Sequence, residues 1–188
     1  MKKLTQISLS LILAATLANA APYTIDKVHT DVSFKVTHLS ISKVRGNFGS
    51  FDATIDFDKA SNEVKAFDAT IDAKSINTQN AKRDDHLRSA DFFEADKFEK
   101  LSFKMTKYVK ESDNEGKIHG DLMIRGITKP VVFDFELGGF HKTDKGEKIG
   151  FSLETDINRK DFGVGKDSSN LTISDKVSIQ IEAEADSK

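Results

Sequence analysis

Strict alternation of apolar and polar residues decides the fold class of this chain. In VVFDFEL (residues 131–137) and KVSIQIEAE (residues 176–184), apolar side chains occupy every second position, beginning at Val131 and Val177. The positions between them are mostly Asp, Glu, Ser and Gln. A period of two is typical of a strand with one buried and one wet face, and such strands normally come from antiparallel sheets.

The same pattern recurs along the chain and predicts an all-β protein. We expect about eight strands, at residues 23–39, 43–57, 63–73, 101–110, 116–125, 130–140, 147–157 and 175–185. Gly46 and Gly49 are candidate bulge or kink sites in the second of them. Strands with polar outer faces predict an antiparallel up-and-down eight-stranded barrel, because closure removes exposed edges. A β-sandwich is the alternative, since it also buries one face of every strand.

One segment, between the third and fourth strands, breaks the β pattern. Residues 78–89 contain good helix formers, and Thr78 is a candidate N-cap. Phe92, Phe93 and Phe98 follow in a polar stretch. Three phenylalanines outside regular alternation predict a lid that packs onto the open end of the barrel.

The expected short helix also carries a cluster of polar residues, Arg83, Asp84 and His86. These side chains either satisfy one another or form a polar rim that holds a ligand headgroup. Ligand pockets commonly combine an apolar wall with a few such groups. The sequence leaves both interpretations open.

The first residues predict export. Lys2 and Lys3 precede a mostly apolar run at residues 7–17, and Ala18-Asn19-Ala20 supplies small residues at signal-peptidase spacing. We expect residues 1–20 to be a signal peptide cleaved after Ala20. An uncleaved anchor is the alternative, but the run is shorter than the roughly 20 residues of a spanning helix. Residues 21–188 then form one domain in the periplasm, or outside the cell, without a permanent membrane anchor.

Composition narrows the function. The chain has 14 Phe, two Tyr, no Trp and no Cys, so disulfide and thiolate chemistry are excluded. This choice of aromatic residues fits either a Phe-rich core or the wall of a hydrocarbon site. Lys and Arg are scattered among Asp and Glu, so we expect no nucleic-acid partner.

Motifs for catalysis or metal binding are weak. The five histidines lack metal-ligand spacing, and His29 with Asp31 is only a minimal metal signal. The chain has no Gly-x-Ser-x-Gly elbow and no phosphate-binding loop. We therefore expect no catalytic residue, no metal and no cofactor.

Several separated motifs together resemble the YceI-like family, periplasmic lipocalin-like barrels described as polyisoprenoid-binding. In chain order they are YTID (23–26), HT (29–30), FKVTHL (34–39), VRGNF (44–48), SINT (75–78), RDDHL (83–87), FF (92–93), GITKP (126–130) and RKDFG (159–163). They span nearly all of residues 21–188. One departure is Glu99, where the family often has proline after the aromatic residue.

The resemblance implies an elongated cavity that holds one long-chain lipid, such as an isoprenoid quinone, polyprenyl phosphate or fatty amide, and it implies no catalysis. The expected cavity wall comprises Phe34, Val36, His38, Phe48, Leu101, Phe103, Met105, Leu122, Ile124, Phe133, Phe135, Phe151 and Leu153. The expected lid comprises Leu87, Phe92, Phe93, Phe98 and Phe162, and the expected headgroup rim Arg83, Asp84, His86 and Arg159.

Two other functions and two assembly states remain open. A lipid-modifying hydrolase would need an activated serine or histidine at the cavity mouth. An envelope-stress interaction module would instead have a barrel filled by its own phenylalanines. The polar outer face suits either a monomer or a homodimer.

Overall fold

The computed structural model describes residues 21–187. The expected signal peptide, residues 1–20, lies outside the described residues. Within the described range, no helix is long and apolar enough to cross a membrane.

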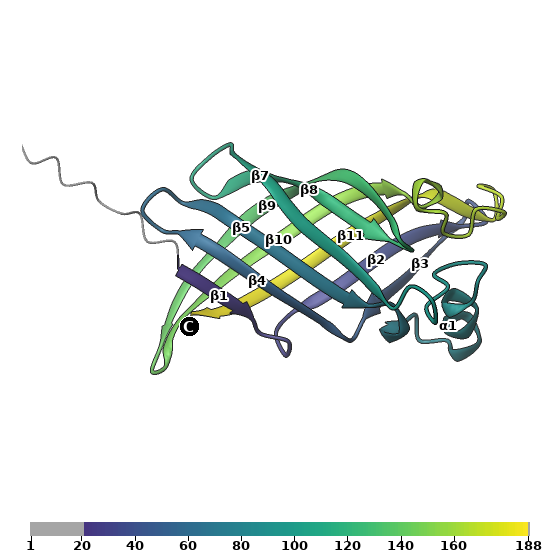
Figure 1. Cartoon of the computed structure of the whole chain (residues 1–188), viewed down its shortest axis with the longest axis horizontal. Helices are drawn as coiled ribbons and strands as arrows, with labels where there is room; N and C mark the ends of the chain where they lie inside the picture. Colours follow the sequence, from purple (N-terminus) through teal and green to yellow (C-terminus); the bar gives the residue numbers. More distant parts are fainter. Residues whose placement is uncertain (1–20, 188) are drawn as a thin grey trace, which may run out of the picture.

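Antiparallel strands make up most of the fold (Figure 1). The strands are β1 (Ala21–Ile25), β2 (Asp31–His38), β3 (Ser42–Phe48), β4 (Phe51–Asp58), β5 (Glu63–Asp72), β6 (Ile76–Asn77), β7 (Lys100–Lys110), β8 (Glu115–Ile124), β9 (Ile127–Thr143), β10 (Gly146–Asn158) and β11 (Ile173–Ser187). The helical segments are η1 (Ala73–Ser75), α1 (Ala81–Arg88) and η2 (Arg159–Phe162).

The sheet closes on itself. Its strand order is β1-β4-β5-β7-β8-β9-β10-β11-β2-β3-β6, and β1 also pairs with β11. β1 and β2 follow each other along β11, and β4 and β3 along that pair, so each pair acts as one long broken strand. The result is the expected antiparallel eight-stranded barrel rather than a sandwich.

Short interruptions divide the first two predicted strands. Asp26 makes an Asx turn between β1 and β2, in which its Oδ1 accepts from the amide of Val28 at 3.0 Å. Gly49 lies at the break between β3 and β4. Gly46 is not a bulge, contrary to expectation: it pairs in register with Phe34, whose ring occupies the space that a Cβ would need.

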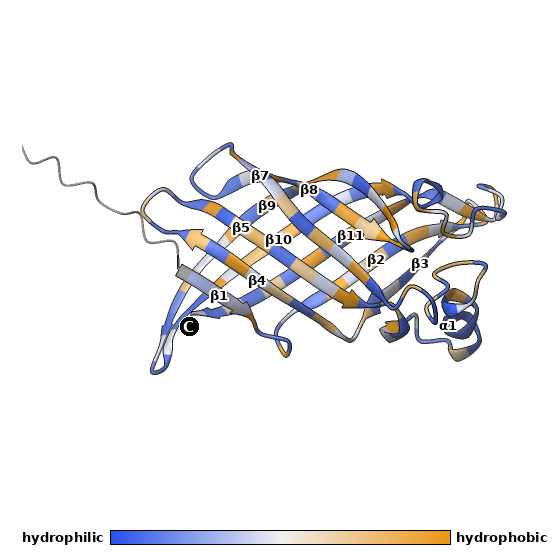
Figure 2. Ribbon diagram, in the orientation of Figure 1, coloured by the Kyte–Doolittle hydropathy of each residue, from blue (hydrophilic) through white to orange (hydrophobic). Residues whose placement is uncertain are grey.

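Hydrophobic and hydrophilic residues alternate along the strands (Figure 2), and the apolar side chains form the buried core of the barrel. The half that contains β1, β4 and the β9–β10 turn is filled with its own side chains, chiefly Tyr23, Ile55, Phe57, Val64, Ile118, Phe135, Ile149 and Phe151. The half near α1 and η2 encloses a cavity. The barrel is therefore solid at one end and hollow at the other.

An ionic cluster joins β1 to the neighbouring strands where the barrel closes. Lys148 of β10 contacts Asp26, Glu184 and Asp186, with 3.4 Å to Glu184 and 3.1 Å to Asp186. The hydrogen bond from Lys148 holds the pKa of Asp26 well below its usual range, and the same bond raises the pKa of Lys148. His29 bonds to Asp26 at 2.9 Å, which raises the pKa of His29.

We predict that acid destabilises this closure, and that Asp26→Asn makes the dependence on pH less steep. A carboxyl whose folded pKa is depressed contributes stability above its unfolded pKa, about 3.9, and loses it as pH falls through the folded pKa. Thermal melts from pH 6 to pH 2 should thus show a smaller fall in Tm for Asp26→Asn than for the wild type. Lys148→Met should reduce the fall in Tm as Asp26→Asn does, and combining the two substitutions should reduce it no further. Identical falls in Tm for wild type and Asp26→Asn would contradict a stabilising role of the ion pair between Asp26 and Lys148.

Candidate ligand cavity

A cavity of about 420 Å³ occupies the barrel half next to α1. Inward residues of β2, β3, β5, β7, β8, β9, β10 and β11 wall it, and α1, η2 and the segments that follow them close its end. Several wall residues, including Phe34, Val36, Val177 and Ile179, are only half-buried although they point into the barrel. Their residual exposure is exposure to the cavity.

Most residues expected in the wall line this cavity. They are Phe34, Val36, His38, Phe48, Leu101, Phe103, Leu122, Ile124, Phe133 and Leu153. Phe135 and Phe151 do not: their ring centroids lie 5.9 Å apart in the filled half. Met105 also lies outside the lining, next to a register shift between β7 and β8. Alternation identifies the inward face of a strand but not the depth along the barrel.

The prediction missed a large part of the wall. β11 contributes Ile173, Val177, Ile179 and Ile181, β5 contributes Phe67, Ala69 and Ile71, and Val32, Val44 and Ile157 complete the apolar surface. The signal was present for β11, whose alternation is among the clearest in the sequence. Because β2 and β11 pair side by side, their inward residues form one continuous wall.

Asn80, rather than Thr78, caps the start of α1. The Asn80 side chain accepts from the amide of Arg83 at 3.1 Å. Thr78 is buried and donates its amide and its hydroxyl to Asp84 Oδ1, at 2.8 and 2.5 Å. Arg83 Nε donates to the same hydroxyl at 2.7 Å. Asp84 is therefore a buried anchor of the lid and does not line the cavity.

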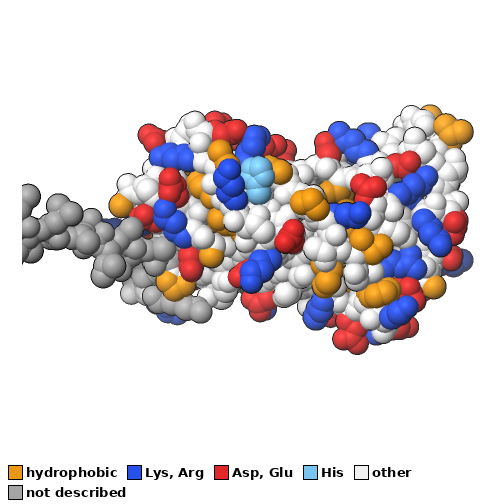
Figure 3. Space-filling view, turned by 45° about the horizontal axis from the view of Figure 1, so that its top comes forward, with side chains coloured by type: hydrophobic (Ala, Val, Ile, Leu, Met, Phe, Trp, Pro, Cys, Tyr) orange, Lys and Arg blue, Asp and Glu red, His pale blue; other side chains and the backbone are white. Residues whose placement is uncertain are grey.

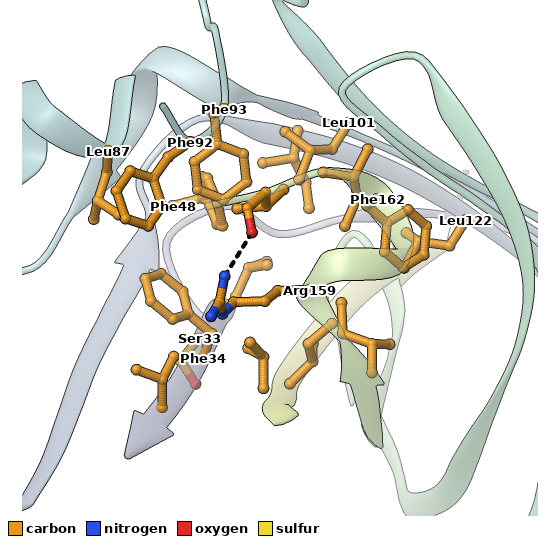
Figure 4. Close-up of a pocket in the computed structure, with 18 of the residues that line it drawn as sticks. Ser33, Phe34, Phe48, Leu87, Phe92, Phe93, Leu101, Leu122, Arg159 and Phe162 are labelled. Carbon is orange, nitrogen blue, oxygen red and sulfur yellow. Dashed lines mark hydrogen bonds between the residues drawn. The ribbon is translucent and has the colours of Figure 1, made fainter. Parts of the chain in front are cut away.

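Phenylalanines after α1 cover the cavity, as expected of a lid (Figure 4). Phe93 packs edge-on against Phe48 with ring centroids 5.9 Å apart, and Phe92 packs edge-on against His86 at 5.0 Å. Leu87 and Phe162 also line the cavity. Phe98 does not: its ring packs over Gly126, in the turn between β8 and β9.

Arg159 has a different role from the expected rim. It is 4% exposed, and Figure 4 shows its guanidinium among the aromatic lining residues. Its donors are taken up by protein acceptors: Asp175 and the carbonyls of Val164, Gly165, Ser168, Ile173 and Ser174. Burial lowers its pKa, while Asp175 opposes that shift. Arg159 thus shapes the loop that roofs the cavity and offers no free donor to a ligand.

Arg125, which the sequence analysis did not single out, ties the lid to the same loop. It donates to the carbonyl of Gly163 at 2.5 Å, and to the carbonyl of Ala90 and the carboxylate of Glu94, both at 2.9 Å. Gly165 completes the link, because its amide donates to the carbonyl of Asp91 at 3.0 Å. Lid and roof therefore form one connected structure.

The cavity meets solvent at its polar end. His86 and Thr172 line the cavity and are also exposed, so the opening lies between α1 and the loop before β11. Arg83, His38 and Ser168 lie around the same end. The structure thus brings Arg83 and His86 to the opening, although Arg83 also bonds to Thr78 and His86 to Asp91.

The partner of His29 differs from the one that the sequence suggested. His29 pairs with Asp26 rather than Asp31, and the ligand atoms of Asp26, His29 and Glu184 lie within 4.8 Å of one another. Lys148 bonds to Asp26 inside this group. A lysine ammonium therefore already balances part of the negative charge of this cluster.

Similar proteins and structures share this architecture. Related UPF0312 proteins are 35% identical over 167 residues in Vibrio cholerae (87% of this chain, 88% of the relative) and 39% over 144 residues in Staphylococcus aureus (76% and 81%). A Campylobacter jejuni YceI crystal structure is 49% identical with a TM-score of 0.77, covering 88% of this chain and 98% of that one.

A more distant structure shares the fold alone. A polyisoprenoid binding domain from Saccharophagus degradans has a TM-score of 0.67 at 13% identity, covering 90% of this chain and 99% of that domain. The model of the YceI-like domain matches residues 23–185, nearly the whole described barrel. This chain therefore belongs to the YceI-like domain family.

Proposed function

We propose that this protein binds one long-chain apolar lipid in its barrel and carries it through the periplasm. The observation that carries the proposal is the cavity of about 420 Å³, walled mostly by aliphatic and phenylalanine side chains. Sites for apolar small molecules have this size and character. A barrel filled by its own side chains accounts for the other half of the molecule only.

The volume indicates the length of chain that fits. An apolar cavity of about 150 Å³ holds one benzene ring, so 420 Å³ holds roughly 16 carbon atoms. Burying each methylene contributes about 0.8 kcal/mol. Ordering costs offset a large part of that sum, which leaves a Kd between about micromolar and nanomolar.

The cavity wall and one solved structure with the same fold support the proposed ligand class. The Saccharophagus domain is described as polyisoprenoid binding, and a branched isoprenoid chain suits a wall of Phe, Ile and Val. An isoprenoid quinone, a polyprenyl phosphate or a fatty amide would place its headgroup at the polar opening beside His86. Binding is favoured over the hydrolase alternative because the cavity is lined mostly by apolar side chains.

Export is the second part of the proposal. It rests on the composition of residues 1–20 and on the first strand, since β1 begins at Ala21 and cleavage after Ala20 would leave the barrel intact. Fractionation of expressing bacteria, with N-terminal sequencing of the periplasmic protein, should find Ala21 first. A full-length chain in the membrane fraction would contradict this part.

A chain-length series tests the binding. We expect saturated primary alcohols to displace a fluorescent apolar probe from the purified protein, with Kd falling by about fourfold for each added methylene until the cavity is full. The wall selects for length and apolarity, so farnesol should compete as well as a straight chain of similar carbon number. Affinity that does not depend on chain length, or no displacement at all, would contradict the proposed function.

A further inference from the structure

Large apolar side chains are exposed on two neighbouring loops at the hollow end of the barrel. Ile41 is 85% exposed and Leu39 51% exposed on the β2–β3 turn, and Leu171 is 74% exposed on the loop before β11. The amide of Leu39 donates to the carbonyl of Thr172 at 2.9 Å, which holds the two loops together. Figure 3 shows hydrophobic side chains at this tip of the molecule. We call Leu39, Ile41 and Leu171 the mouth patch.

The mouth patch borders the opening of the cavity. His38 and Thr172 line the cavity, and each is adjacent in sequence to a patch residue. The turns at the filled end differ: Lys59 to Asn62, Ser112 to Asn114 and Asp144-Lys145 are polar or small. Among the described residues, three of the four large apolar side chains that are more than half exposed, Leu39, Ile41 and Leu171, lie at the end through which a ligand would pass, and the fourth is Val28.

The backbone geometry of the β2–β3 turn does not favour a leucine at position 39. Leu39 and Ser40 have φ values of 50° and 59°, and the amide of Ile41 donates to the carbonyl of His38 at 3.1 Å. This is the pattern of a type I′ turn, which favours Asn-Gly at its two central positions. A leucine in the left-handed region is locally unfavourable. Leu39 therefore makes the turn less stable than asparagine would, and its apolar side chain is exposed to solvent.

The charges beside the mouth patch favour an anionic partner. Lys43 and Arg45 follow the β2–β3 turn, and Lys166 with Asp167 lies on the other loop. These three cationic side chains and one carboxylate carry a net positive charge, whereas the formal net charge of the whole chain is −2. Apolar tips flanked by cationic side chains are the features of surfaces that bind the interface of anionic membranes.

We propose that the mouth patch docks on the surface of an anionic lipid bilayer, so that the lipid passes between bilayer and cavity without crossing water. This inference rests on the proposed function. Docking places the opening against the acyl region, and each methylene kept out of water raises the transfer rate by roughly fourfold. The alternative is that the mouth patch binds a second copy of this chain.

Vesicle flotation tests the docking itself. The mature protein should float with vesicles of equal parts phosphatidylcholine and phosphatidylglycerol, and Leu39→Asn with Ile41→Ser and Leu171→Ser should reduce the bound fraction by at least about tenfold. Val28→Ser is the matched control, since Val28 is 84% exposed on the β1–β2 turn beside the filled half. It should bind like the wild type. Because Asn suits the left-handed turn, Leu39→Asn alone should keep or raise Tm.

Transfer kinetics separate this inference from the proposed function. The rate at which a pyrene-labelled sixteen-carbon chain leaves the protein should rise with vesicle concentration for the wild type and be independent of it for the triple variant. Equal equilibrium affinity of both proteins for the probe is expected. A wild-type rate independent of vesicle concentration would overturn the docking proposal while leaving binding intact. A dimer that the triple variant dissociates would assign the patch to self-association and overturn it as well.

Discussion

Arg159→Met is expected to lower the free energy of unfolding by about 3–5 kcal/mol. The guanidinium is buried and donates to several backbone carbonyls of residues 164–174 and to Asp175. Methionine would fill similar space but leave those acceptors without donors. Each buried acceptor left unsatisfied costs about 1–3 kcal/mol, less where the loop relaxes to reach water.

Urea unfolding followed by far-UV circular dichroism measures this loss. Arg159→Lys should fall between wild type and Arg159→Met, because an ammonium group has fewer donors and cannot reproduce the planar fork. The exposed Arg45 of β3 gives the matched control, and Arg45→Met should change stability by less than about 0.5 kcal/mol. A change of that small size for Arg159→Met would mean that the roof loop is held by other contacts.

Ile179→Asp is expected to weaken lipid binding by about 100-fold or more while the barrel remains folded. Ile179 lines the cavity from the middle of β11 and is only half-buried, so a carboxylate there can be hydrated while the cavity is empty. A bound hydrocarbon would strip that water from the charge. The unpaired charge would then cost several kcal/mol in the complex but little in the free protein.

The adjacent residue supplies the control for Ile179→Asp. Gln180 is exposed on the outer face of β11, so Gln180→Asp adds the same charge without reaching the cavity. Displacement of a fluorescent apolar probe should give an unchanged Kd for Gln180→Asp. Equal Kd values for wild type and a folded Ile179→Asp variant would place the ligand elsewhere.

The barrel was predictable from sequence because each strand records its own environment. The apolar positions of residues 131–137 and 176–184 alternate so regularly that the buried face follows directly. Closure was an inference from many polar outer faces, and pairing of β11 with both β1 and β2 confirms it. The break at Asp26 escaped because an Asx turn depends on one side-chain bond rather than on a change in composition.

The cavity was predictable only in part. Phe133 and Phe135 occupy equivalent inward positions of β9, yet Phe133 lines the hollow half and Phe135 fills the solid half. Their depth depends on strand tilt and on cross-barrel neighbours such as Phe151, none of which a single strand encodes. Local pattern gives the direction of a side chain, whereas tertiary packing decides what space it meets.

The polar residues show the same limit. Asp84 was predicted at a headgroup rim because its polar cluster lies beside three phenylalanines, and Arg159 was placed there with the family resemblance. The structure instead uses both to satisfy buried backbone and hydroxyl groups of the lid and roof. Such long-range acceptors, up to 16 residues from Arg159, leave no local sequence signal.

Native mass spectrometry of the protein, purified without detergent from bacteria that express the full-length chain, shows directly whether a lipid occupies the barrel. We expect a mature chain beginning at Ala21 with one bound long-chain lipid, and loss of that adduct in Ile179→Asp but not in Gln180→Asp. A wild-type protein that stays at its apo mass, even after incubation with a lipid extract of the same cells, would contradict the proposed lipid binding.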